Sequence, residues 1–206
     1  EQFRLAIEAL AQGREEIARR VIENDARVNE LEVSIDDDCA RVIAKRQPAA
    51  GDLRMVLGVT RMTTDLERIG EGVEKVAYRA ATIRGSERLT RMRYYDVVRV
   101  AQGAQGMLHK ALDAFARLDV DAAAEVVDED DAIDLAFNAI MRQLISFMME
   151  DPRTISSALE AVFIAKSIER IGDHAKNVAE SVVQVVKGKD VRHASAEQIR
   201  AEVAGE

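Results

Sequence analysis

The chain of 206 residues is 48% apolar and 32% charged, with two prolines and no tryptophan, a composition typical of helical proteins. Its formal net charge of −8 argues against a nucleic-acid partner, because a phosphate-binding surface needs clustered Lys and Arg. A single cysteine excludes an intrachain disulfide, and since we find neither an export signal nor an apolar run of roughly 18 residues, we expect a cytoplasmic protein that does not insert into the membrane.

The first part of the chain predicts three helices, over residues 1–12, 14–46 and 52–84. In the third helix, apolar residues recur at alternating steps of four and three, which indicates a helix packed in a bundle. This seam comprises Met62, Leu66, Ile69, Val73, Val76 and Ala80. The apolar stripe of the second helix is less regular and includes Val28, Ile35, Cys39 and Val42. We expect Cys39 to be a buried, small apolar residue rather than a nucleophile.

The second part predicts helices over residues 91–118, 121–150 and 153–187. Asp119 and Asp151 stand where N-cap residues belong, and Gly188 ends the last helix. The residues after Gly188 form a polar tail that is either a short helix or disordered. The seam of the last helix comprises Ile164, Ile168, Ile171, Ala175, Val178 and Val182. The preceding helix has a stripe of Ile133, Phe137, Ile140, Leu144 and Phe147.

These two parts are copies of one another. ERIGDHAKNVA at residues 169–179 repeats ERIGEGVEKVA at 67–77, 102 positions earlier, and VVDEDDAIDLAF at 126–137 repeats VIENDARVNELE at 21–32, 105 positions earlier. A repeat of this length indicates duplication of a whole bundle, because solenoid repeats are shorter. The sequence therefore predicts an all-α fold of two tandem three-helix bundles.

We place the first bundle at residues 1–86, the second at 87–188 and the polar tail at 189–206. The first predicted helix is much shorter than its counterpart in the second copy, and Glu rather than Met stands at position 1. We therefore expect the first helix to be truncated in this numbering, with about 15 residues preceding it.

Paired carboxylates are the main candidate site. Glu169 and Asp173 are four residues apart, so they share one face of their helix, and the same holds for Asp130 and Asp134. An antiparallel hairpin turning at Asp151 brings the two pairs side by side.

The first copy repeats this arrangement with one substitution. Glu67 and Glu71 face Asp25 and Asn29, where Asn replaces one carboxylate. In both copies a glycine, Gly70 or Gly172, stands in mid-helix at a cost of about 1 kcal/mol relative to Ala. We expect each glycine to allow close approach of a neighbouring helix or a ligand.

Grouped carboxylates repel one another unless a cation lies among them, and oxygen-only ligands suit hard ions such as Mg²⁺, Ca²⁺, Mn²⁺ or Fe³⁺. The alternative is that these acids only form ion pairs with basic residues of the same helices, namely Lys75, Lys176, Arg68 and Arg170. His174 is a less favoured additional ligand. We find neither a Glu-x-x-His pair, nor a Gly-rich phosphate loop, nor a nucleophile elbow, so the chain is not expected to be an enzyme.

The duplicated ERIG[DE] helices, each preceded by a D-x-x-x-[ND] helix, resemble the PhoU family of accessory proteins of phosphate-specific transport. Further stretches of proteobacterial type are IAKRQPAAGDLR (43–54), ALDAFARLD (111–119) and QLISFMMEDPRTI (143–155). The resemblance implies two tandem three-helix bundles, a homodimer, and metal clusters at the paired motifs. It implies that the metal ligands are Asp25, Asn29, Glu67, Glu71, Asp130, Asp134, Glu169 and Asp173. Glu71 departs from the Asp that is usual in the family.

The resemblance also implies a function: negative regulation of phosphate uptake and of the phosphate-starvation response. Its expected partners are the ATPase subunit of the phosphate ABC transporter and a sensor histidine kinase, which would recruit the protein to the inner membrane face. The expected cofactor is Fe, Mn, Mg or Zn, and Arg68 and Arg170 are candidates for partner contacts. Two other functions stay open at this point: a metal-dependent enzyme using carboxylate-bound ions, and a purely structural helical dimerisation module.

Overall fold

The computed structural model describes residues 1–82, 91–192, 194 and 196–204, and these residues form helices and short connections without any β-strand. The predicted all-α class is therefore confirmed. The helices are α1 (Gln2–Gln12), α2 (Glu15–Arg46), α3 (Ala50–Thr82), α4 (Arg91–Arg117), α5 (Val120–Glu150), one 3₁₀ turn (Pro152–Thr154), α6 (Ile155–Lys187) and α7 (Ala196–Ala204). The predicted end of the third helix at residue 84, and the predicted boundary at residue 86, lie outside the described residues.

The helix ends have local causes in the sequence. The Asp119 side chain accepts a hydrogen bond from the Ala122 backbone N–H at 3.0 Å, which caps α5 as predicted. Asp151 stops α5 and accepts from the Arg153 N–H at 3.1 Å, so that the chain turns through Pro152 into α6. Gly188 ends α6 in the left-handed region, at φ 77°.

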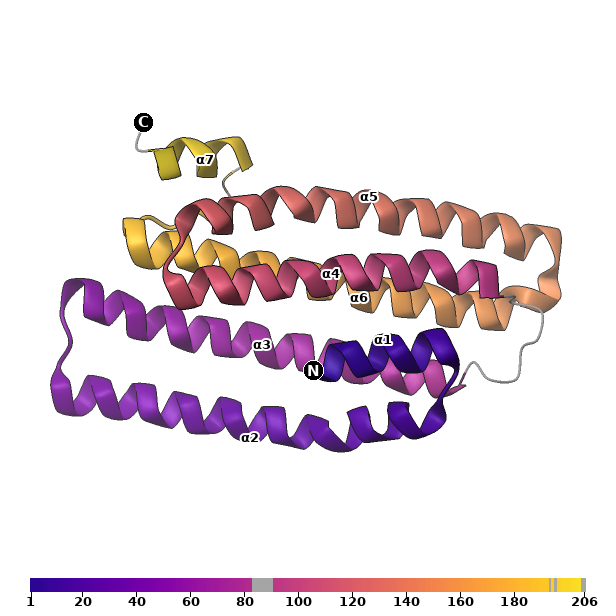
Figure 1. Ribbon diagram of the computed structural model, residues 1–206, viewed down its shortest axis with the longest axis horizontal. Helices are drawn as coiled ribbons and strands as arrows, with labels where there is room; N and C mark the ends of the chain where they lie inside the picture. Colours follow the sequence, from indigo (N-terminus) through magenta and orange to yellow (C-terminus); the bar gives the residue numbers. More distant parts are fainter. Residues whose placement is uncertain (83–90, 193, 195, 205–206) are drawn as a thin grey trace.

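Four helices form a layer in the order α2, α3, α6, α5 (Figure 1). Its centre is the antiparallel pair α3 and α6, which pack along each other more extensively than any other two helices. In Figure 1, α1 lies in front of α3 and α4 lies in front of α6, so that both cover the same side of the layer. The opposite side of the layer has no such covering helix among the described residues.

The predicted seams line the core between these helices. All six seam residues of α6 are at most 1% exposed. On α3, the four seam residues from Ile69 to Ala80 are buried, whereas Met62 and Leu66 are only half-buried. The difference follows from the length of α1, which is 11 residues, against 27 for α4.

The predicted burial of Cys39 is wrong. Only Ile17, Ala18 and Val21 of α2 are buried, and Cys39 is a half-exposed free thiol. Val42 is 40% exposed. The reason is that the later turns of α2 have only α3 beside them in the described part of the chain, so one side of the stripe stays open.

Within the predicted tail, residues Ala196–Ala204 form the short helix α7. α7 packs on α5, with Ile199 fully buried, and Lys187 Nζ donates to the Val203 carbonyl at 2.8 Å. By length and composition α5 is the one helix of the described residues that could cross a membrane, a test that core helices of soluble proteins also pass.

Candidate functional site

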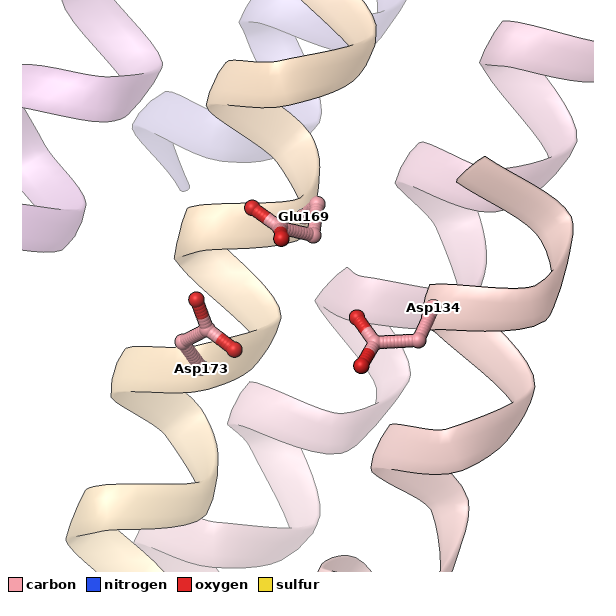
Figure 2. Close-up of side chains that lie close together, drawn as sticks. All are labelled: Asp134, Glu169 and Asp173. Atoms are coloured by element: carbon pink, nitrogen blue, oxygen red, sulfur yellow. The ribbon is translucent and has the colours of Figure 1, made fainter. Parts of the chain in front are cut away.

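Three carboxylates converge on the outer side of the α5–α6 hairpin (Figure 2). Asp134 comes from α5, and Glu169 and Asp173 come from successive turns of α6. One oxygen of each lies within 4.8 Å of an oxygen of the other two, and none of the three residues is buried. The structure therefore brings together three of the four acids predicted from the spacing in the second copy. We call these three residues the carboxylate cluster.

The fourth predicted acid, Asp130, lies behind the cluster. It is 4% exposed, and its Oδ2 accepts a hydrogen bond from Lys176 Nζ at 2.8 Å. Its Oδ1 is buried without a hydrogen-bond partner in the described structure. An orphaned buried carboxylate oxygen is costly, and it marks a place where a further donor or a cation would be favourable.

The three carboxylates of the cluster differ in how far nearby cations neutralise them. Partial burial raises the pKa of Asp134, and the charges of Asp130 and Glu169 raise it further. Burial also raises the pKa of Asp173, followed by the charges of Glu169 and Asp130. Glu169 has a cationic partner, because Lys166 Nζ lies 2.6 Å from both of its oxygens. A hard cation would relieve the repulsion, so the donor set of three carboxylates fits such an ion.

Glycines set the distance between the helices at both predicted sites. A Cβ atom on Gly172 would lie 3.3 Å from Ile133 Cγ2 and 3.7 Å from Asp130 Oδ1. A Cβ atom on Gly70 would lie 3.1 Å from Val28 Cγ1 and 3.5 Å from Asp25 Oδ1. The predicted close approach of a neighbouring helix at these two glycines is confirmed.

The corresponding residues of the first copy are arranged differently. Arg68 Nη1 lies 3.1 Å from a Glu71 oxygen, and Lys75 Nζ lies 3.3 Å from the same oxygen. On α2, Asn29 Nδ2 donates to Asp25 Oδ2 at 3.5 Å. Within the described residues these acids do not converge as the carboxylate cluster does. Each contacts a donor of its own helix: Arg68 contacts both Glu67 and Glu71, and Asn29 contacts Asp25.

The pKa values of the first copy reflect this pairing. Burial raises the pKa of Glu71, but hydrogen bonds from Lys75 and Arg68 outweigh it and hold the pKa below its usual value. Burial and the neighbouring charge of Glu71 raise the pKa of Glu67. The alternative, that the acids only form ion pairs, thus describes Glu71 well. In the second copy it describes Glu169 and Asp130, which contact Lys166 and Lys176, but it does not describe Asp134 and Asp173.

Other predicted candidates lie elsewhere. His174 turns away from the carboxylate cluster: its Nδ1 lies 2.8 Å from Asp65 Oδ1 on α3. Asn177 Nδ2 donates to the same oxygen at 3.0 Å, so these residues join α6 to α3. Arg170 is exposed, and Arg68 is occupied by Glu71.

Sequence reasoning missed a cleft of about 810 Å³ between α3, α6 and the segment after α6. Its lining includes Arg61, Asp65, Lys176, Glu180 and Arg192. Glu180 is 6% exposed, and burial raises its pKa to about 7 despite the nearby Lys176. A search for acids shared by the two copies does not find Glu180, because its counterpart in the first copy is Tyr78.

Comparison with known proteins gives a consistent result. The PhoU domain family matches residues 1–80 and 97–182. The phosphate-specific transport system accessory protein PhoU of Escherichia coli K12 is 42% identical over 205 residues, covering 100% of this chain and 84% of that protein. The homologue from Pseudomonas putida is 41% identical over 200 residues, covering 97% of this chain and 78% of that protein.

Solved structures agree in fold. The crystal structure of PhoU from Pseudomonas aeruginosa has a TM-score of 0.86 and 40% identity, covering 91% of this chain and 90% of that one. The phosphate transport system regulatory protein PhoU from Streptococcus pneumoniae has a TM-score of 0.85 and 26% identity, covering 93% and 89%. The names of these relatives are those of accessory and regulatory proteins rather than enzymes.

Proposed function

The chain belongs to the PhoU family, and from this premise we propose that it negatively regulates phosphate uptake and the phosphate-starvation response. Its relatives are accessory and regulatory proteins of phosphate transport, and the same coarse role holds for this chain. The finer role is that of a cytoplasmic homodimeric adaptor, which couples the ATPase subunit of the phosphate ABC transporter to a sensor histidine kinase. These partners would hold it at the inner membrane face.

The carboxylate cluster is the observation that supports a ligand-dependent adaptor. Asp134, Glu169 and Asp173 would hold a Fe, Mn, Mg or Zn ion, with Asp130 behind them. A bound ion supplies positive charge at this surface. The residues themselves form an acidic patch that repels anionic partners, and neutralising the patch would change which partner surface fits there.

The first copy is the weaker candidate for an ion site. Glu67, Glu71, Asp25 and Asn29 offer fewer free carboxylate oxygens, because Arg68 and Lys75 already neutralise Glu71. An ion there would have to displace two basic side chains.

Elemental analysis of untagged protein, purified without chelator, tests the ion site. The matched variant replaces Asp130, Asp134 and Asp173 by Asn and Glu169 by Gln. We expect the wild-type protein to retain Fe, Mn, Mg or Zn and the variant to lose it. If neither protein retains an ion after incubation with each metal, the cluster is a helix-packing and partner-recognition feature instead.

A pull-down tests the adaptor role separately. Chelated and metal-loaded protein are each incubated with the purified transporter ATPase and with the cytoplasmic part of the sensor kinase. We expect the two forms to differ in the amount of partner bound. Equal binding by both forms would contradict a metal-dependent adaptor while leaving the family's regulatory role intact.

A further inference from the structure

A buried acid without a hydrogen-bond partner lines the cleft between α3, α6 and the segment after α6. Glu180 is 6% exposed, yet none of the described residues donates a hydrogen bond to its carboxylate or forms an ion pair with it. The hydroxyl of Ser181, which also lines the cleft and is 7% exposed, makes no hydrogen bond to these residues either. Because an unpaired buried polar group is costly, a ligand that supplies the missing donor would be favoured in this cleft.

Three cations line the same cleft, each from a different part of the chain. Arg61 extends from α3, Lys176 from α6 and Arg192 from the segment after α6. Arg61 donates to the uncharged Gln184 and forms no ion pair with a described residue. The Lys176 ammonium carries three donors, of which one binds Asp130. The cleft therefore offers free N–H donors to the oxygens of an anion.

The lining of the cleft is balanced in charge rather than basic. The three cations are matched by Glu180 and by two other acids, Asp65 and Asp173. Asp65 already contacts His174 and Asn177, and Asp173 belongs to the carboxylate cluster, so Glu180 is the acid left for a ligand. A fully ionised anion would meet the cations but would be repelled by Glu180. An oxyanion that keeps a hydroxyl satisfies both kinds of group.

The repeat shows that the fold does not leave this space by itself. The offset of 102 pairs Ser181 with Arg79 and Arg61 with Phe163. In that equivalent part of the antiparallel α3–α6 contact, the Arg79 guanidinium covers the Phe163 ring at 4.3 Å, and its Nη1 lies 2.7 Å from a Glu160 oxygen. The short side chain of Ser181 cannot reach across in this way, so the cleft stays open.

We propose that this cleft binds inorganic phosphate, with Arg61 and Arg192 holding its anionic oxygens and Glu180 accepting a hydrogen bond from its hydroxyl. Arginine suits the first task because its planar guanidinium matches the geometry of an oxyanion. A buried acceptor suits the second, because a ligand without the hydroxyl leaves that acceptor unpaired. The choice of phosphate among oxyanions that carry a donor rests on the proposed function, and the inference deepens that function by naming a ligand for it.

The test is isothermal titration calorimetry at pH 8, on metal-free protein from which the chelator has been removed. Burial raises the pKa of Glu180 to about 7, so at pH 8 its carboxylate is mainly ionised and can accept a hydrogen bond. The charged groups that face it are Lys176, Arg192, Asp65, Asp130 and Asp190. Inorganic phosphate keeps one hydroxyl at this pH, whereas sulfate and methyl phosphate keep none. We expect phosphate to bind with a Kd below about 1 mM, and each of the other two at least about tenfold more weakly.

Two variants separate the acceptor from the cations. Glu180→Gln presents an amide that can accept from phosphate or donate to sulfate, so the preference for phosphate should fall below about threefold. Arg61→Gln with Arg192→Gln should weaken phosphate binding at least about tenfold. The matched control, Arg41→Gln with Arg117→Gln, removes the same charge from two exposed arginines that also contact acids, and it is expected to leave binding unchanged.

No binding of phosphate at about 10 mM, equal binding of phosphate and sulfate, or cleft variants that bind like the wild-type protein would overturn the proposal. Tighter binding of the amino acid glycine, which also combines an oxyanion with a donor, would assign the cleft to a zwitterion instead. Neither elemental analysis nor the pull-down enters this test. A failure here therefore leaves the ion site and the adaptor role standing, and a failure of either of those leaves phosphate binding by metal-free protein unchanged.

Discussion

The helical hairpins α2–α3 and α5–α6 carry acids at the same positions of the repeat, but different side chains neutralise these acids in each. In the α2–α3 hairpin, Arg68 and Lys75 contact Glu71, and Asn29 replaces a carboxylate. In the α5–α6 hairpin, Lys166 contacts Glu169, while Asp134 and Asp173 face each other with raised pKa values. Equal spacing of acids in a sequence thus does not give equal sites. The basic residues one turn away decide how much charge is left for a ligand.

The copies also differ in what surrounds the hairpin. The second has the 27-residue α4 above it and α7 packed on α5. The first is covered by the 11-residue α1 and exposes more of its second helix. Burial is therefore concentrated in the second copy, and with it the groups whose pKa values burial raises most, such as Glu180.

The largest expected effect is on ion binding, when matched carboxylates are replaced in each of the two copies. Asp134→Asn with Asp173→Asn should weaken binding of Mn²⁺ about a hundredfold, or about 2.7 kcal/mol, because both free acids of the cluster are lost. The matched pair Glu67→Gln with Glu71→Gln should weaken it less than about threefold. Isothermal titration calorimetry at constant pH measures both. Similar losses in the two variants would show that both copies hold ions equally well.

The next effect contrasts Glu180 with its repeat counterpart Tyr78. Burial raises the pKa of Glu180 to about 7, above the ordinary value of 4.5. A raised folded-state pKa contributes stability that is full below pH 4.5 and is lost as pH rises through about 7. This carboxyl should therefore lower the free energy of unfolding by roughly 2 to 3 kcal/mol between pH 5 and pH 8.

Glu180→Gln should remove that loss, so the variant should match wild-type protein near pH 5 and exceed it in stability at pH 8. Urea denaturation at the two pH values, in chelator, is the measurement. Tyr78→Phe, at the exposed counterpart in the first copy, should change the stability at neither pH. A pH dependence that persists in Glu180→Gln would assign the effect to another group.

The smallest effect concerns the two glycines at the helix contacts. Ala gains about 1 kcal/mol over Gly in a helix interior. At Gly70 the neighbour is Val28 of the half-open helix α2, which has room to move, so Gly70→Ala should stabilise the protein by up to about 0.5 kcal/mol.

At Gly172 the neighbour Ile133 is 7% exposed and also lies against Gly103 of α4. It cannot yield, so Gly172→Ala should destabilise the protein by about 1 kcal/mol. Thermal and urea unfolding of the two single variants compare them directly. The same sign for both would mean that the helices of the two copies are equally free to move apart.

Much of this architecture could be predicted from the sequence. The step pattern of α6 predicted its buried seam, because a helix repeats every 3.6 residues and a stripe of Ile, Val and Ala at that period must be covered. Asp119 and Gly188 predicted helix ends through local hydrogen bonding and backbone conformation. The repeat predicted which acids of different helices would come near one another.

The sequence could not decide the contacts of side chains that had a choice of neighbours. Asp130 has the right spacing for the cluster but contacts Lys176, and His174 follows Asp173 but contacts Asp65 on α3. Cys39 lies on an apolar stripe that α2 leaves half-open. Each outcome depends on which helix is packed alongside and how far it extends, and helical periodicity carries no such information.

The sequence by itself determined the helices, their duplication and the pairing of acids four residues apart, because these follow from the geometry of a single helix and the length of each hairpin. Only the tertiary structure decided that Asp134, Glu169 and Asp173 share one patch while Glu71 is neutralised. The physical reason is range: hydrogen bonding and periodicity act within a few residues, whereas burial and charge neutralisation depend on side chains brought together from distant parts of the chain.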